Sequence, residues 1–251
     1  MRLENTVAFI SGGARGMGAA EARLFSQEGA KVVIGDVLDD DGRQTESEIN
    51  ELGGECLYVH LDVKSEESWA SAISETVDRF RKLDILVNNA GVASFFMLEE
   101  LSVNEWDRVM DINAKGVFLG TKAAIPEMRR AGGGSIINIS SICDEVAQAG
   151  YPHYIAAKGG VKMLTKAMAL DLVKNNIRVN ALAPGAVETA TGFWHKEEFS
   201  QLREKVRSRI PMGRPARAEE MVGAAIFLAS EEESGYVTGI SLPVDGGYLS
   251  Y

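Results

Sequence analysis

A chain of 251 residues is long enough for one large α/β domain with a full hydrophobic core. The formal net charge of −10 disfavours nucleic acid and anionic membranes as partners, because both would repel the protein. Two cysteines and three scattered histidines indicate neither a disulfide framework nor a metal site, so we expect no catalytic metal.

The N-terminal residues carry charges of both signs and run directly into an apolar strand, which leaves no room for the apolar core of a signal peptide. The longest apolar runs are also too short to span a bilayer. We therefore expect a soluble, cytoplasmic protein.

Short segments rich in Val, Ile and Leu alternate along the chain with longer segments of helical period. The expected strands are 6–11, 31–35, 55–60, 85–88, 135–139, 177–183 and 240–243. The expected helices are 17–27, 41–52, 66–80, 103–128, 154–173 and 219–229. Continuously apolar strands separated by helices are typical of a parallel sheet that is covered on both faces. The pattern predicts an α/β, doubly wound parallel sheet of about seven strands, a Rossmann fold, in a single domain over 1–251.

One long stretch, 189–218, lacks clear strand or buried-helix character apart from a charged amphipathic piece around 197–209. A segment of this length inside a compact domain is usually functional. We interpret it as a lid or substrate loop, with a surface excursion or an oligomer contact as the alternative.

A glycine-rich turn follows the first strand, at Ser11-Gly12-Gly13-Ala14-Arg15-Gly16-Met17-Gly18. Glycines here would let the backbone turn sharply and approach a pyrophosphate, which the N-terminus of the next helix would face. The same glycines could also serve only the turn. Taken alone, this spacing is a moderate indication of a dinucleotide site.

Asp36 ends the second strand, 18 residues after Gly18. An acid at this place can accept hydrogen bonds from the adenosine ribose and would repel the extra phosphate of NADP. Val37 follows it where NADP binding would favour a base, whereas Arg15 beside the turn is the feature that could contact a 2′-phosphate. The balance favours NAD over NADP, and a helix N-cap remains a compatible second role for Asp36.

Further motifs occur in a fixed order along almost the whole chain. They are Asp62-Val63, Asn88-Asn89-Ala90-Gly91, Asn113, Ser140-Ser141, Tyr154-Ile155-Ala156-Ala157-Lys158 and Pro184-Gly185-Ala186-Val187-Glu188-Thr189. Each motif alone has an ordinary structural interpretation, but the set does not. With the glycine turn, the chain resembles the short-chain dehydrogenase/reductase family.

The resemblance implies a cofactor groove. Asp62 and Val63 would contact the adenine, and Asn89, Ala90 and Gly91 would line the groove. The segment from Pro184 through Gly185 and Val187 to Thr189 would hold the nicotinamide carboxamide. The turn would contribute Gly12, Arg15, Gly16, Met17 and Gly18, the second strand Asp36 and Val37, and the active site Tyr154 and Lys158.

The predicted chemistry is hydride transfer between NAD and a secondary alcohol or ketone, which needs an acid-base group and a donor for the developing oxyanion. Tyr154 and Lys158 are four residues apart, so they share one face of a helix. We expect the Lys158 ammonium to lower the pKa of the Tyr154 phenol. By the resemblance, Ser141 would hydrogen-bond the substrate oxygen, and Asn113 would hold a water that relays protons from Lys158.

Rival assignments exist for each role. Tyr151 is a second tyrosine, but Ile155 stands where its lysine would be needed, and Ser140 has the wrong spacing to replace Ser141. Cys143 lacks a histidine to activate it and is interpreted as pocket lining. Phe95, Ser141, Cys143, Tyr151, Phe193 and Trp194 are the predicted substrate residues, which suggest an alicyclic, aromatic or steroid-like substrate.

Within the family the chain is similar to bacterial NAD-linked hydroxysteroid and cyclic-alcohol dehydrogenases. A 3-oxoacyl-carrier-protein reductase is the alternative enzyme, disfavoured because Asp36 opposes NADPH. A non-catalytic NAD-binding regulator is the alternative from another class, since a fold alone does not establish an activity. The resemblance also implies a homotetramer in which helices 103–128 and 154–173 form a dimer interface.

Overall fold

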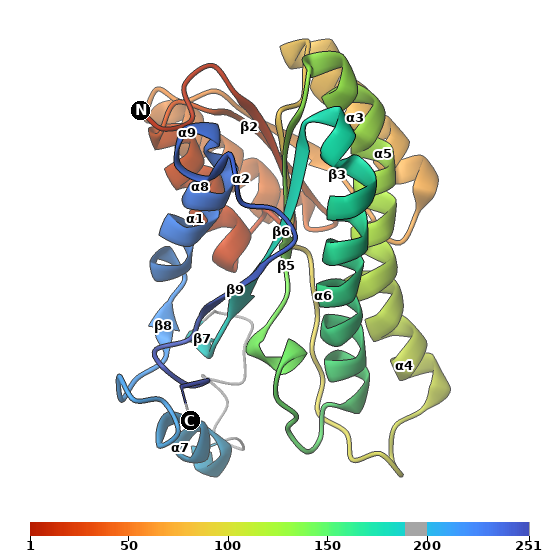
Figure 1. Cartoon of the computed structure of the whole chain (residues 1–251), viewed down its shortest axis with the longest axis vertical. Coiled ribbons are helices and arrows are strands. Elements are labelled where there is room, and N and C mark those ends of the chain that lie inside the picture. The colour runs from red at the N-terminus through yellow and green to blue at the C-terminus, as the bar shows by residue number, and fades with distance from the viewer. Residues whose placement is uncertain (189–199, 251) are drawn as a thin grey trace.

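The computed structural model of the chain describes residues 1–188 and 200–250 (Figure 1). Its main sheet has seven strands, all parallel, in the order β3-β2-β1-β4-β5-β6-β9. The strands are β1 Val7–Ser11, β2 Lys31–Asp36, β3 Cys56–His60, β4 Ile85–Asn88, β5 Gly134–Ile139, β6 Ile177–Pro184 and β9 Ser241–Val244. The predicted Rossmann-type fold is confirmed.

Nine α-helices are assigned within the described ranges. They are α1 Gly16–Gln27, α2 Asp39–Glu51, α3 Glu66–Phe80, α4 Val103–Met110, α5 Gly116–Ala131, α6 Pro152–Leu172, α7 Ser200–Arg207, α8 Glu219–Ala229 and α9 Glu231–Ser234. Shorter elements are a π-helical turn η1 Asp111–Lys115, two 3₁₀ turns η2 Ile142–Asp144 and η3 Val173–Asn175, and two short strands, β7 Val187–Glu188 and β8 Ala216–Arg217. In the part of the chain described, no helix is long and apolar enough to cross a membrane.

The helices form a layer on each side of the sheet, and each layer encloses its own core (Figure 1). On one side, Ile10 of β1 packs in the cluster that contains Phe25 of α1 and Ile226 of α8. On the other side, Phe9 packs in the cluster that contains Trp69 of α3, and these two rings are 5.5 Å apart. Successive strand residues therefore face opposite cores, which explains why the strands are apolar at consecutive positions.

The strand order reverses at β1. The chain builds outward from β1 to β2 and β3, then crosses back to place β4 on the other side of β1. In sheets of this kind, ligands bind where the strand order reverses, outside the carboxyl ends of the strands. The segments that leave β1 and β4 at that edge are the glycine turn and the Asn89-Ala90-Gly91 motif.

The long helix expected at 103–128 is interrupted by the π-helical turn η1. Asn113 lies fully buried in this turn, and its side-chain amide donates to the Val109 carbonyl at 2.9 Å. In a regular α-helix that carbonyl would accept from the backbone amide of Asn113. The side chain thus competes for the acceptor where the helix widens, and such turns are frequent at functional sites.

Two other expectations are corrected. Helix α6 begins at Pro152 rather than at 154, because proline suits the first helical position, where its missing N–H is not needed. The described part of 189–218 contains α7, which matches the charged amphipathic piece expected around 197–209, and also β8, a strand that was not expected and that pairs in parallel with β7 at Val187↔Ala216.

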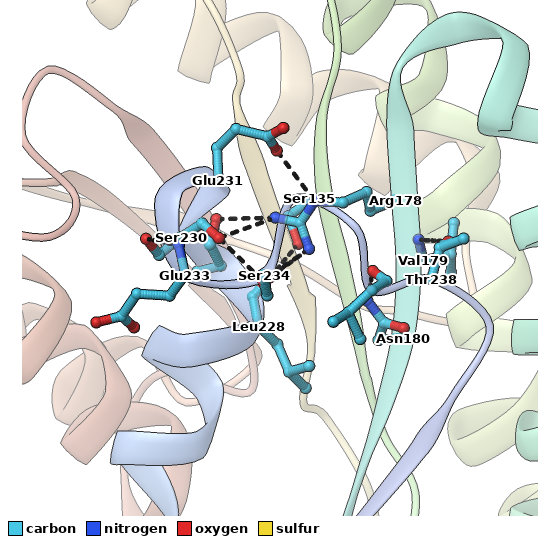
Figure 2. Close-up of polar contacts among 12 residues, drawn as sticks. Ser135, Arg178, Val179, Asn180, Leu228, Ser230, Glu231, Glu233, Ser234 and Thr238 are labelled. Atoms are coloured by element: carbon cyan, nitrogen blue, oxygen red, sulfur yellow. Dashed lines mark hydrogen bonds and ion pairs between the residues drawn. The ribbon is translucent and has the colours of Figure 1, made fainter.

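Arg178 joins β6 to the end of α8 (Figure 2). Its buried guanidinium donates to the Leu228 carbonyl at 3.0 Å and to the Ser234 hydroxyl at 2.9 Å. It also donates to the carbonyls of Ala229 and Ser230 and to the exposed Glu231 carboxylate. Because the last carbonyls of a helix have no intrahelical partner, Arg178 supplies their hydrogen bonds.

We expect Arg178→Met to lower the free energy of unfolding by about 3 kcal/mol, since several buried acceptors would lose a charged donor. Chemical denaturation would measure the loss. Arg130→Met is the matched control, because Arg130 is exposed and its ion pair among the described residues is with Glu127, three residues away. Equal stability of both variants would contradict this role of Arg178.

Candidate active site

The turn between β1 and α1 is packed so closely that side chains are excluded from it. Gly12 has φ +67°, and a Cβ there would lie 2.8 Å from the Cα of Ala90. A Cβ at Gly18 would lie only 2.2 Å from the Gly12 carbonyl oxygen. No side chain caps the N-terminus of α1 in the described structure, so the amides of Gly16, Met17 and Gly18 in its first turn can receive an anion.

Asp36, at the end of β2, is held against this turn. One carboxylate oxygen accepts from the Ala14 amide at 3.1 Å, and the other accepts from the Leu38 amide at 3.2 Å. The neighbouring Val37 side chain is exposed. Arg15 forms a 3.7 Å ion pair with Asp41, which directs its guanidinium toward the start of α2.

Asn89 braces the turn. Its side-chain amide donates to the carbonyls of Ser11 and Gly12, both at 3.0 Å. The Ser11 hydroxyl accepts from the backbone amides of Asn89 and Ala90 at 3.1 and 3.2 Å. These contacts join β1 to β4 where the strand order reverses. Sequence reasoning missed Ser11, which a serine at a strand end next to glycines could have suggested.

The remaining predicted groove residues lie around the same edge. Gly91 is next to Asn113: a Cβ at Gly91 would be 2.8 Å from the Asn113 side-chain oxygen. Asp62 follows β3 and accepts from the Lys64 amide, while Val63 is buried. Gly185 follows Pro184 at the end of β6 and donates to the Val244 carbonyl of β9 at 2.9 Å. Thr189, Phe193 and Trp194 lie outside the described residues.

Tyr154 and Lys158 lie in α6, close to the end of β5. The Lys158 ammonium is buried and donates to the Ile139 carbonyl at 2.7 Å. Its nitrogen is 5.6 Å from the centre of the Tyr154 ring. Ser141, which follows β5, lies within hydrogen-bonding reach of the phenol, and its hydroxyl accepts from the Cys143 amide at 3.1 Å. The fold therefore gathers Ser141, Tyr154 and Lys158 at one place.

Asn113 connects this group to the loop after β4. Its side-chain oxygen accepts from the Val92 amide at 3.2 Å, and its nitrogen donates to the Val92 carbonyl at 2.9 Å. Asn113 thus fixes the loop that carries Gly91 and Val92, beside Lys158. Its role in a water relay stays a prediction.

An aromatic row leads to Tyr154. The Phe95 ring meets the edge of the Tyr151 ring at 5.4 Å, and Tyr151 meets Tyr154 at 6.5 Å. Backbone contact fixes the two loops to each other, because the Phe96 amide donates to the Gly150 carbonyl at 2.9 Å. Cys143 is partly buried beside Ser141. The row presents an apolar surface next to the phenol.

Comparisons with known proteins identify the relatives of this chain. A family model described as enoyl-(acyl carrier protein) reductase matches residues 12–249. The chain is 46% identical over 252 residues to trans-4-hydroxycyclohexanecarboxylate dehydrogenase of Sinomonas cyclohexanicum, covering 98% of this chain and 93% of that one. It is 43% identical to 3-alpha-(or 20-beta)-hydroxysteroid dehydrogenase of Mycobacterium tuberculosis, covering 99% and 91%.

A crystal structure of a short-chain type dehydrogenase/reductase from Mycobacterium marinum superposes with a TM-score of 0.94 at 32% identity, covering 99% of this chain and 97% of that one. The chain belongs to the short-chain dehydrogenase/reductase family. It is an oxidoreductase that acts on CH–OH donors, and its family uses NAD or NADP. The side-chain-free cradle at Gly12 and Gly18, with the helix amides beside it, fits such a cofactor.

One electrostatic expectation is wrong for the chain without a cofactor. The pKa of Tyr154 is raised rather than lowered, because burial disfavours the phenolate, and Ser141 opposes this only in part. Burial also lowers the pKa of Lys158 to about 8. Burial removes water from the charged form of each group, so it favours the neutral phenol and the neutral amine. This effect of burial is larger than the attraction between the two charged forms.

Sequence reasoning also missed a polar chain beside the aromatic row. The Ser94 hydroxyl donates to Glu105, and His153, next to Tyr154, lies 2.8 Å from the same hydroxyl through Nε2. Arg108 holds Glu105 with two hydrogen bonds of 2.7 and 2.8 Å and keeps the pKa of that carboxyl at about 2. These hydrogen bonds connect α4 and the loop at Ser94 to the start of α6. The residues that form them are too far apart in sequence for their spacing to reveal the contact.

Proposed function

We propose that the protein transfers a hydride between NAD and a secondary alcohol or ketone borne on an alicyclic, aromatic or steroid-like ring, with Tyr154 as the acid-base group. The observation that carries the proposal is the gathering of Ser141, Tyr154 and Lys158 at the end of β5, next to the aromatic row Phe95–Tyr151. An acid-base group, an oxyanion donor and an apolar wall are what such a substrate requires.

In oxidation, Tyr154 accepts the proton of the substrate hydroxyl, and in reduction it donates a proton to the forming alkoxide. The Ser141 hydroxyl donates to the substrate oxygen as that oxygen gains charge. The Lys158 ammonium favours the phenolate and would also hold the nicotinamide ribose. The bound nicotinamide supplies the hydride acceptor or donor. Asn113 would hold the water that returns protons to Lys158.

Three features support NAD rather than NADP. Asp36 is fixed at the end of β2 by two backbone amides, where its charge would repel a 2′-phosphate. The next residue, Val37, offers no cation. Arg15, the residue that could oppose this choice, has its guanidinium directed to Asp41.

The substrate class is supported by the aromatic row and by the names of the relatives, which act on a ring alcohol and on hydroxysteroids. A ring alcohol that carries a carboxylate is the second candidate. It is favoured by the relative that is 46% identical to this chain and is named for trans-4-hydroxycyclohexanecarboxylate.

We further propose that the chain forms a single domain over 1–251, that 189–218 is a substrate loop, and that four copies assemble into a homotetramer. Exposed apolar side chains on α4, α5 and α6 support a dimer interface at these three helices, since isolated monomers rarely expose such clusters. They are Val103 and Trp106 on α4, Phe118 on α5, and Met163 and Leu170 on α6. The net charge of −10 argues against nucleic acid as a partner.

A paired substrate screen tests the proposal. The screen would follow nicotinamide absorbance with NAD and NADP in parallel. The alcohols, assayed with the oxidised cofactors, are cyclohexanol, 4-hydroxycyclohexanecarboxylate, an aryl secondary alcohol and a hydroxysteroid. A 3-oxoacyl thioester would be assayed with the reduced cofactors. We expect cyclic alcohols to turn over with kcat/KM at least about 10-fold higher with NAD than with NADP.

Other outcomes select among the alternatives. Faster turnover with NADP contradicts the role of Asp36, and exclusive reduction of the thioester favours the acyl-carrier-protein reductase. Tight NADH binding without turnover on any substrate favours a regulator. A preference for the carboxylate over cyclohexanol selects the second candidate.

A further inference from the structure

A buried carboxylate that the proposed mechanism does not use lies behind the active site. Asp144 is in η2, three residues after Ser141, and its side chain is 0% exposed. One oxygen accepts from the Ser140 hydroxyl at 2.7 Å and from the Ser241 hydroxyl at 2.8 Å. Its backbone amide donates to the Ser141 carbonyl at 2.8 Å. Asp144 thereby links the Ser141 turn to β9.

The other oxygen of Asp144 is buried without a hydrogen bond. Lys162 of α6 is 4.0 Å from it, but the Lys162 ammonium is hydrogen-bonded to Glu145. Lys162 is therefore shared between Asp144 and Glu145 and is hydrogen-bonded only to Glu145 among the described residues. A carboxylate desolvated in this way acts strongly on nearby ionisable groups, because water does not screen it.

We propose that Asp144 is a positioning residue of the active site: its buried carboxylate fixes the Ser140–Ser141 turn against β9 and sets the protonation equilibrium of the Tyr154–Lys158 pair. The inference rests on the proposed function of that pair. It assigns the residue a role in the pH dependence of the reaction rather than a contact with substrate.

The sign of the effect follows from charge. Asp144 is linked to α6 through Ser140, whose hydroxyl donates to Asp144 and also lies 3.3 Å from the Lys158 carbonyl. The ionisable neighbours of Tyr154 are Cys143, Asp144, Tyr151 and Lys158, and those of Lys158 include Cys143 and Asp144. Burial raises the pKa of the Cys143 thiol, so that thiol is neutral at working pH and Asp144 supplies the negative charge. A fixed anion opposes loss of a proton from a phenol and from an ammonium alike.

Removal of this anion therefore moves both deprotonations to lower pH, whichever of the coupled groups controls the rate. We expect Asp144→Asn to shift the midpoint of the kcat/KM profile, measured from about pH 6 to pH 10, down by about one unit. Oxidation on the acid limb would rise about 10-fold, and reduction on the alkaline limb would fall correspondingly. Asp144→Ser, a smaller neutral variant, should give the same shift.

Two controls separate charge from structure. Asp171→Asn removes an exposed carboxylate near the end of α6, away from Asp144 and Lys162, and should leave the midpoint unchanged. Ser241→Ala removes one donor to Asp144 but keeps the charge, so its midpoint should also stay in place. A wild-type midpoint in both neutral Asp144 variants, or an equal shift in Ser241→Ala, would overturn the inference.

Tyr154→Phe, measured alongside, separates the two hypotheses. If Tyr154→Phe keeps activity, the proposed function of the pair fails. If it is inactive while the Asp144 variants keep the wild-type profile, only the role of Asp144 fails.

Discussion

Tyr154→Phe is expected to lower kcat by about 10²- to 10⁴-fold while the fold and NADH binding stay intact. The substitution keeps the ring that meets Tyr151 and removes only the hydroxyl that we propose exchanges the substrate proton. Steady-state rates in both directions measure the loss, and NADH fluorescence titration measures cofactor binding.

Tyr151→Phe is the matched control, because it deletes the same group from the adjacent ring. Tyr151 has Ile155 rather than a lysine four residues later, so its loss should change KM more than kcat. Retention of more than about a tenth of wild-type kcat by Tyr154→Phe would place the proton transfer elsewhere.

The environment of Tyr154 also predicts the direction of its pH dependence. Since burial raises the pKa of the phenol, oxidation, which needs a proton acceptor, should accelerate as the pH rises. Reduction, which needs a proton donor, should be well supported near neutral pH. Tyr154→Phe therefore tests the assignment in both directions of the reaction, oxidation and reduction.

Glu21→Met is expected to stabilise the protein increasingly as the pH rises, and this pH-dependent gain reaches about 4 kcal/mol at pH 8. Glu21 lies in α1 and is 0% exposed, and neither carboxyl oxygen has a hydrogen-bond partner within the described structure. Burial raises its pKa from 4.5 to about 8. Methionine has a similar length and needs no hydrogen bond.

The sign follows from proton linkage. Between pH 4.5 and about 8 the unfolded chain has ionised Glu21, whereas the folded chain keeps its proton. The folded state therefore binds more protons, and stability is lost as the pH rises, by up to about 1.4 kcal/mol per pH unit. The difference between variant and wild type should grow across this window and level off above it.

Urea denaturation of both proteins from about pH 5 to pH 9 measures this difference. Glu75→Met is the control, because Glu75 is an exposed glutamate on α3. A difference between Glu21→Met and wild type that does not vary with pH would show that Glu21 is ionised in the folded state.

The sequence predicted those features that depend on local pattern. All seven strands of the main sheet were expected within one or two residues, because β1 to β6 and β9 are short apolar runs between polar turns. The spacing of Tyr154 and Lys158 placed both on one helix face, and the resemblance to the family pointed to these two residues and to Ser141.

Features that depend on three-dimensional surroundings could not be predicted. The π-helical turn at Asn113 arises from a side chain that competes for the Val109 carbonyl, and no periodicity reveals such competition. The raised pKa of Tyr154 and the unpartnered carboxyl of Glu21 depend on burial by distant segments. In the sequence, Asp144 and Glu21 are ordinary acids of a loop and a helix.

The bond between Ser241 and Asp144 spans 97 positions and has a consequence for how the protein is made. During synthesis on a ribosome, β5, η2 and α6 emerge long before β9. Until β9 emerges, the Asp144 carboxylate lacks the Ser241 hydroxyl, which is one of its two hydroxyl donors. The sheet edge at β6 stays open over the same interval. A nascent chain therefore holds its catalytic residues without the strand that fixes them, and activity should begin only after the residues of β9 have left the exit tunnel.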